Sequence, residues 1–439
     1  MPGEAKEASG KVALPSGLRA LRHRNFQLFF SGQLISLIGT WMQTVAQSWL
    51  VYRLTGSALL LGTVGFTGQI PVFLLAPAGG IIADRHDRHR IVVATQTSAM
   101  ALALILATLT LTGRVHVWHI MVLAALLGVV NAFDIPARQA FLVDMVGKED
   151  LMNAIALNSS MFNGARVVGP AVAGILVASI GEGWCFLANA VSYVAVIVGL
   201  LLMKLGRQPI AGPANSPLED AIEGFRFAWH TKPIRALLLL IGLVSLVAMP
   251  YTVLMPIFAD QILHGGARGL GMLMGATGVG ALLGAGLLAT RSGLGGLGRM
   301  VMISSACFGV SLMLFAGSRW FWISVALLIP AGFSMMLQMA ASNTLIQAMV
   351  PDRLRGRVMA VYSMMFMGMA PMGALLAGAV ANRLGAQLTV AIGGAVCVVG
   401  SGFFAARLPA LRAEARQLVI AQGMAGGEPA EEMTIRTRP

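Results

Sequence analysis

Charged residues are scarce in this chain of 439 residues. Only 11% of the residues are charged, whereas 57% are hydrophobic. A soluble globular chain carries roughly 25% charged residues, because its surface must face water. The composition therefore excludes an ordinary soluble protein and predicts that lipid surrounds much of the surface.

Acidic residues are fewer than basic ones, so the formal net charge is +13. In a soluble protein this excess would indicate binding to nucleic acid. Here the charges lie between apolar runs and not on one face of a helix, as is typical of a membrane protein with basic cytoplasmic loops. We therefore expect a lipid bilayer and no nucleic acid as the partner.

Cysteine is also rare. Cys185, Cys307 and Cys397 lie in separate apolar runs, which predicts neither a disulfide framework nor a zinc site. The sequence has no His-Glu-x-x-His, no Walker phosphate loop and no Gly-x-Ser-x-Gly, so we expect neither an enzyme nor a cofactor. Without a Walker loop, the energy for any transport must come from a gradient or a separate ATPase.

Twelve apolar runs are long enough to cross a bilayer, which takes roughly 20 residues. They cover residues 26–52, 59–83, 91–111, 118–135, 154–180, 184–205, 236–259, 270–290, 300–316, 320–341, 358–381 and 388–406. These runs predict an all-α membrane protein with two bundles of six helices. The polar N-terminus and the long first run predict no cleavable signal.

Basic residues cluster in alternate loops between these runs. The loops that are rich in basic residues contain Arg85, Arg88, Arg90, Arg138, Lys148, Arg291, Arg299, Arg353, Arg355, Arg357 and the basic residues of 204–235. Because cytoplasmic loops are enriched in Lys and Arg, these loops and both termini are expected to face the cytoplasm across the plasma membrane.

Four segments are expected along the chain. They are a first bundle over 1–206, a cytoplasmic linker over 207–234, a second bundle over 235–408 and a mobile cytoplasmic tail over 409–439. In the linker, Leu218, Ile222, Phe225 and Trp229 follow helical spacing, which predicts an amphipathic helix on the membrane surface. The tail contains the acidic residues Glu428, Glu431 and Glu432.

The two halves of the sequence repeat. With a shift of 204 residues, 10 of the 30 positions in 145–174 match 349–378 without a gap. The bundles are therefore interpreted as a duplication. Parallel repeats of this kind place a binding site between the halves, near the middle of the membrane.

A short motif follows the second apolar run. From Gly80 to Arg90 it reads Gly-Ile-Ile-Ala-Asp-Arg-His-Asp-Arg-His-Arg. This resembles the signature loop of the major facilitator superfamily, which is Gly, three residues, Asp-Arg, one residue, Gly and two basic residues. Asp87 replaces the second Gly, and His89 replaces one basic residue.

The resemblance implies a gate at this loop. Gly80 permits close approach of another helix, and Asp84 can favour one docked arrangement of the halves through a helix dipole. Arg88 can pair with an acid on a neighbouring helix, and Asp134 is the expected partner. With Arg85, these residues would form a cytoplasmic latch, whereas the alternative is an ordinary basic loop.

The fifth run contains Arg-Val-Val-Gly-Pro-Ala-Val-Ala-Gly, starting at Arg166. It resembles the antiporter signature of the same superfamily, in which Gly169, Pro170 and Gly174 would allow close packing and a bend. The alternative is a generic seam of small residues. Arg166 lies roughly 18 Å into its span, near the midplane, where it would either attract an anionic substrate or pair with a carboxylate.

Polar residues recur along the first run, and several share one helical face. A polar face in a bilayer helix is expected to line an aqueous cavity, or else to hydrogen-bond a neighbouring helix. The candidates for substrate binding are Gln33, Ser36, Thr40, Gln43 and Gln47 in the first run, Asn163 and Arg166 in the fifth, and Gln338 in the tenth.

Together with 131–140 and 157–163, these motifs resemble the branch that includes the enterobactin exporter and other transmembrane secretion effectors. The resemblance covers about 18–408 and implies a secondary exporter of amphipathic small molecules, such as drugs or siderophore-like metabolites. It also implies alternating access and protons as the coupling partner.

Coupling cannot be assigned to residues, because Ala124 stands where many such exporters have Arg and the first run has no carboxylate. Two alternatives to an exporter stay open. One is an importer or facilitator on the same fold, and the other is a non-transporting receptor. The oligomeric state stays open, and a monomer is compatible with the sequence.

Overall fold

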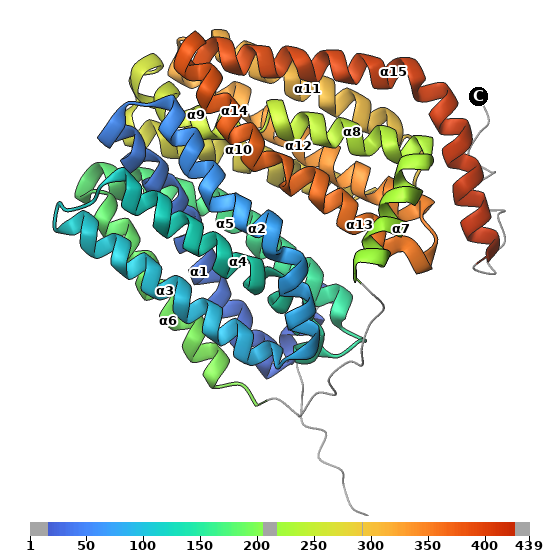
Figure 1. The fold of residues 1–439 in the computed structure, drawn as a ribbon, viewed down its shortest axis with the longest axis horizontal. Helices are drawn as coiled ribbons and strands as arrows, with labels where there is room; N and C mark the ends of the chain where they lie inside the picture. The colour runs from blue at the N-terminus through green and yellow to red at the C-terminus, as the bar shows by residue number, and fades with distance from the viewer. Residues whose placement is uncertain (1–15, 205–216, 292, 426–439) are drawn as a thin grey trace, which may run out of the picture.

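A computed structural model describes residues 16–204, 217–291 and 293–425, and these residues form helices without a strand. In the first half, a 3-10 turn precedes α1 (Arg24–Thr55), α2 (Ala58–Arg85), α3 (Arg88–Leu111), α4 (Val117–Val146), α5 (Leu151–Ile180) and α6 (Glu182–Leu201). After α7 (Pro217–His230), the second half comprises α8 (Lys232–Val247), α9 (Tyr251–Ile257), a π-helical turn (Phe258–Ile262), α10 (Gly266–Ala289), α11 (Leu297–Gly317), α12 (Phe321–Met349), α13 (Asp352–Met367), α14 (Met369–Leu384) and α15 (Ala386–Ala425). Figure 1 shows these two groups side by side.

The number of membrane-spanning segments agrees with the predicted all-α fold. In the described part of the chain, eleven segments are long and apolar enough to cross a membrane, with α8 to the π-helical turn counted as one and α13 with α14 as another. The twelfth predicted span is α1, whose 32 residues are long enough but whose polar residues lower its hydropathy. The short break between the ninth and tenth spans is present, because α11 ends at Gly317 and α12 begins at Phe321.

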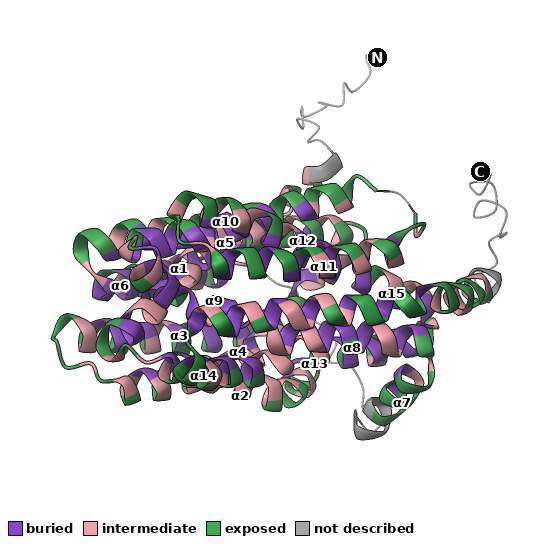
Figure 2. Ribbon diagram, turned by 90° about the horizontal axis from the view of Figure 1, so that it is seen from above, coloured by how far each residue is buried: buried purple, intermediate pink, exposed green. Residues whose placement is uncertain are grey.

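The outer surface is apolar, as lipid contact requires. Buried residues lie where helices face one another, whereas many exposed positions on the outside are large hydrophobic side chains (Figure 2). Trp118, Trp184, Trp320 and Trp322 are exposed near the starts of α4, α6 and α12. Exposed tryptophans at one level are typical of a membrane–water interface.

The helix predicted in the linker is α7. It packs against α13, where Glu223 forms ion pairs with Arg353 (3.6 Å) and Arg357. Ile222, Phe225 and Trp229 are exposed, and the side chain of Leu218 lies outside the described positions. The apolar face of α7 is thus free to contact a membrane surface.

The tail departs from the prediction. Residues 409–425 were expected to be mobile, but α15 continues as a helix through Pro409 to Ala425. Proline lacks an N–H and usually bends or breaks a helix. Here its effect is limited to a bend, after which Leu411, Leu418 and Val419 pack on the second half. The acidic residues Glu428, Glu431 and Glu432 lie outside the described residues.

Within the described residues, the two halves share an apolar cluster at one end only. At the end away from α7, a single apolar cluster contains residues of both halves, such as Leu61, Val177, Phe258 and Leu270. At the end that carries α7, which we call the linker end, each half has its own separate cluster. The molecule is therefore closed at the far end, and its halves are apart at the linker end.

Glycines bring the helix backbones into contact at the closed far end. A Cβ on Gly378 of α14 would lie 2.7 Å from the Ala58 carbonyl oxygen and 2.9 Å from the Gly62 Cα of α2. On the other side, a Cβ on Gly174 of α5 would lie 3.0 Å from the Gly271 Cα of α10. Gly174 and Gly378 correspond in the sequence repeat, so the duplication places the same close contact on both sides of the junction.

Candidate transport site

A cavity of about 310 Å³ lies between the two halves. The first half contributes polar residues from α1, α2, α4 and α6, and the second half contributes α9 and α10. The polar lining residues are Thr40, Gln43, Thr44, Gln47, Ser48, Gln69, Asn131, Asn189, Tyr193 and Thr252, and apolar walls are formed by Val51, Leu61, Val64, Leu127, Val253 and Met274 among others. A cavity with mostly neutral polar groups and apolar walls suits an amphipathic small molecule.

Gln43 is held in place in this lining. The Asn189 Nδ2 donates a hydrogen bond to the Gln43 Oε1 at 2.6 Å, and both residues are nearly buried. Gly39 lets α1 and α6 come this close, since a Cβ there would lie 2.5 Å from the Asn189 Oδ1. Because the two amides are paired, the remaining donors and acceptors of Gln43 and Asn189 face the cavity in fixed directions.

The predicted polar face of α1 divides into two parts. Thr40, Gln43 and Gln47 line the cavity, whereas Gln33 and Ser36, closer to the linker end, are buried outside it. Within the described residues the Gln33 Oε1 has no hydrogen-bond partner. The part of α1 that lines the cavity therefore extends from its middle toward the far end, from Thr40 to Val51.

Two other predicted residues lie outside this cavity. Asn163 donates a hydrogen bond to the Ser159 carbonyl one turn earlier in α5. Gln338 is 1% exposed and faces a small internal hollow of the second half with Ser245 and Met335. Neither polar atom of its side chain has a hydrogen-bond partner among residues 16–204, 217–291 and 293–425.

Arg166 lies at the junction of the halves and does not itself line the cavity. Its guanidinium is 5.7 Å from the centre of the Trp41 ring, and its backbone packs against Gly278 of α10. It lies near Tyr251, the neighbour of the cavity residue Thr252. In the described part of the chain no carboxylate lies within ion-pair distance of Arg166, so its predicted role as one partner of a structural ion pair has no support there.

Several cavity residues were not predicted as site residues. Asn189 and Tyr193 lie four residues apart on α6, with Ser192 beside them, so a polar face on the sixth run was a signal that could have identified them. Gln69 and Asn131 are single amides in long apolar runs. Only the packed structure shows that these two face the same space.

The predicted ion pair between Arg88 and Asp134 is wrong. The Arg88 guanidinium lies 3.3 Å from the Asp144 Oδ1 and 3.7 Å from Asp84. Asp134 instead pairs with Arg138, one turn later on the same helix, at 3.3 Å. The prediction failed because α4 was expected to end at residue 135, whereas it continues to Val146 and brings Asp144 beside the loop.

Asp134 nevertheless forms a buried polar cluster. Its Oδ1 accepts hydrogen bonds from the Thr95 hydroxyl at 2.8 Å and from the Gln96 amide at 2.9 Å. With Arg138 on its other oxygen, the carboxylate is fully surrounded by donors. This cluster joins α3 to α4.

The rest of the loop is exposed at the linker end. Asp84 occupies the last turn of α2 and pairs with Arg88, not with a helix N-terminus. Asp87 is the N-cap of α3 and accepts hydrogen bonds from the backbone N–H groups of His89 and Arg90. A Cβ on Gly80 would meet no atom within 4 Å, so the surface there is open in this conformation.

We expect the Arg88–Asp144 pair to stabilise the loop. Asp144→Asn should lower the free energy of unfolding in detergent by about 1–2 kcal/mol, because the half-buried Arg88 guanidinium loses its neutralising partner. In a double-mutant cycle measured by thermal unfolding, Arg88→Gln and Asp144→Asn should be strongly non-additive. The matched cycle of Arg88→Gln with Asp134→Asn should be additive. Additivity in the first cycle would contradict the assigned pair.

A bundle of two related six-helix halves, with lipid-facing surfaces and a polar cavity between the halves, is the architecture of a multi-pass membrane transporter. The chain belongs to the transmembrane secretion effector family of the major facilitator superfamily, whose family model matches residues 15–434.

Similar proteins are transporters as well. The chain is 29% identical over 400 residues to the staphyloferrin A transporter of Staphylococcus aureus, covering 88% of this chain and 97% of the relative. It is 25% identical to macrolide efflux protein A of Streptococcus pyogenes (82% and 90% covered) and 26% identical to the enterobactin exporter EntS of Shigella boydii (84% and 86%). Among solved structures, the nucleoside transporter NupG superposes with a TM-score of 0.69 at 15% identity, covering 88% of this chain and 98% of NupG, which shows the shared fold.

Proposed function

We propose that this protein is a secondary exporter that moves amphipathic small molecules out of the cell by alternating access, in exchange for protons. The cavity walled by both halves is the observation that supports this most directly. Its neutral amides and hydroxyls, apolar walls and nearby Arg166 suit drugs or siderophore-like metabolites. The relatives, an enterobactin exporter and a macrolide efflux protein among them, favour export.

In this proposal the linker end faces the cytoplasm and both termini lie there, in the plasma membrane. The basic residues of the loop after α2 favour this orientation. The present conformation, closed at the far end, is then the inward-facing state. Rocking of the two halves would close the linker end and open the far end.

The loop after α2 acts as a latch in the outward-facing state. Asp84 and Arg85 are exposed now, and the space beside Gly80 is free to receive a helix of the second half. Arg88, already fixed by Asp144, would hold the loop in the right position. The latch thus has its partners only when the linker end is closed.

The test uses proteoliposomes with a pH-sensitive dye inside and an imposed proton gradient. Amphipathic compounds and a siderophore are added one at a time, and the proton flux each one triggers is followed. We expect at least one compound to drive proton movement opposite to its own, and Asp84→Asn to reduce this about ten-fold or more, since the outward-facing state loses its latch. The matched control is Glu149→Gln, an exposed acid in the next loop at the linker end.

Each other outcome is informative. Compounds that cross without proton movement would exclude proton antiport, and accumulation inside cells that express the protein would indicate an importer. Normal transport by a folded Asp84→Asn protein would exclude the latch.

A further inference from the structure

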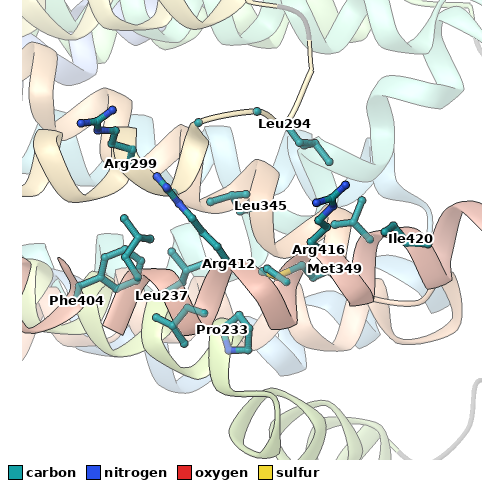
Figure 3. A pocket seen from close by; sticks show the side chains of 17 residues that line it. Pro233, Leu237, Leu294, Arg299, Leu345, Met349, Phe404, Arg412, Arg416 and Ile420 are labelled. Carbon is teal, nitrogen blue, oxygen red and sulfur yellow. The ribbon is translucent and has the colours of Figure 1, made fainter. Parts of the chain in front are cut away.

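A second hollow, of about 800 Å³, lies at the linker end of the second half, away from the cavity between the halves. Its walls come from α8, α12, the loop between α10 and α11, and the part of α15 around and beyond Pro409. It therefore exists because α15 continues past the end of its membrane span. Figure 3 shows side chains from these elements facing one space.

The walls are mostly apolar, but three arginines belong to the lining. Leu237, Leu345 and Phe404 are among the apolar side chains that line it. Arg412 and Arg416 lie one turn apart on α15, and both side chains leave this helix on the side of the hollow, Arg412 toward α11 and Arg416 toward Leu294 (Figure 3). None of the described residues that line the hollow is acidic.

The three positive charges are not neutralised within the described chain. Arg299, Arg412 and Arg416 are exposed, and no described carboxylate lies within ion-pair distance of them. Arginine binds phosphate oxygens through paired N–H donors. Three such groups above an apolar hollow make a site for a molecule with an anionic phosphate head and an apolar tail.

The level of the hollow favours a lipid. Arg299 lies in the first turn of α11, Pro233 in the first turn of α8, and both arginines of α15 follow the end of its apolar segment. These positions mark the boundary between the apolar part of the bundle and water. Basic pockets between membrane helices at this level bind anionic lipid headgroups.

We propose that this hollow, the lipid hollow, binds an anionic phospholipid of the bilayer. The anionic headgroup lies at the rim of the hollow that carries Arg299, Arg412 and Arg416, and one acyl chain lies along Leu237, Leu345 and Phe404. The bound lipid ties the end of α15 to α8, α11 and α12. Lipid binding at this hollow does not depend on the direction of transport or on its coupling.

Binding is tested with the full-length protein after delipidation in a neutral detergent. Fluorescently labelled phosphatidylglycerol should bind at least ten-fold more tightly than the same lipid with a choline headgroup, and the difference should shrink as salt is raised. Arg412→Gln with Arg416→Gln should weaken the binding of phosphatidylglycerol about ten-fold or more. Arg412→Lys with Arg416→Lys should retain most of it, which separates loss of charge from misfolding.

The matched control is Arg114→Gln with Arg383→Gln, two exposed arginines at the far end, which should leave binding unchanged. Equal binding of the two lipids, or unchanged binding in the glutamine variant, would overturn the proposal. Glycerol 3-phosphate is the soluble probe, and affinity equal to that of the lipid would assign the site to a free anion instead. If the lipid bound only after removal of residues 426–439, the acidic tail would be the natural occupant and the lipid assignment would be wrong.

Discussion

A protein with leucine in place of Gly378 is expected to fold but to have lost at least about 90% of its transport activity. The added side chain would meet backbone atoms of α2, 2.7 Å from the Ala58 carbonyl oxygen. Backbone atoms of a helix cannot rotate away as a side chain can, and overpacking at such a contact costs roughly 1–3 kcal/mol or more. The closed far end would therefore be disfavoured, and the transporter would be held out of the conformation described here.

Two measurements check this prediction. Substrate flux is followed in proteoliposomes, and spin labels on the far ends of α2 and α14 report whether the halves separate. Gly402→Leu is the matched control, since a Cβ at Gly402 would meet no atom within 4 Å. Normal flux and unchanged distances in Gly378→Leu would show that this contact is dispensable.

The second large effect is expected at Arg166. Arg166→Ala should lower kcat/KM for anionic substrates by about ten- to hundred-fold, the range for losing a hydrogen bond to a charged partner. Neutral substrates should be transported nearly as before. The reason is that Arg166 lies at the junction of the halves with its guanidinium over the Trp41 ring, and that it has no carboxylate partner in the described part of the chain.

The comparison of substrate charges distinguishes recognition from structure. Arg166→Lys should retain part of the preference for anions, because it keeps the charge but loses the planar donors. Arg319→Ala, in an exposed loop at the far end, is the control. An equal loss for anionic and neutral substrates would indicate a structural role, and no loss for either would exclude recognition by Arg166.

The helices could be predicted from the sequence because each membrane span must satisfy its backbone hydrogen bonds within itself and present apolar side chains to lipid. The ends of helices were less predictable. The fourth apolar run ends at residue 135, but α4 continues through Pro136 to Val146. This one extension changed the partner of Arg88, because Asp144 then reached the loop.

Part of the transport site could also be predicted from the contrast between lipid and polar side chains. A polar face on α1 must avoid lipid, so its existence followed from composition and periodicity. Which of its residues meet a cavity depends on how closely α6 approaches, and that depends on Gly39. The position of Gln338 could not be predicted for the same reason. A buried amide in a membrane helix can face an internal hollow as readily as a substrate.

The glycine contacts at the far end have a kinetic consequence. Where Gly62 meets Gly378 and Gly174 meets Gly271, backbone lies against backbone, and no long side chains interdigitate between the paired residues. Two smooth surfaces of this kind can part without a concerted change of rotamers. The activation barrier for opening the far end should then come mainly from lost van der Waals contact and from wetting of the exposed surfaces, which favours rapid switching between the two states.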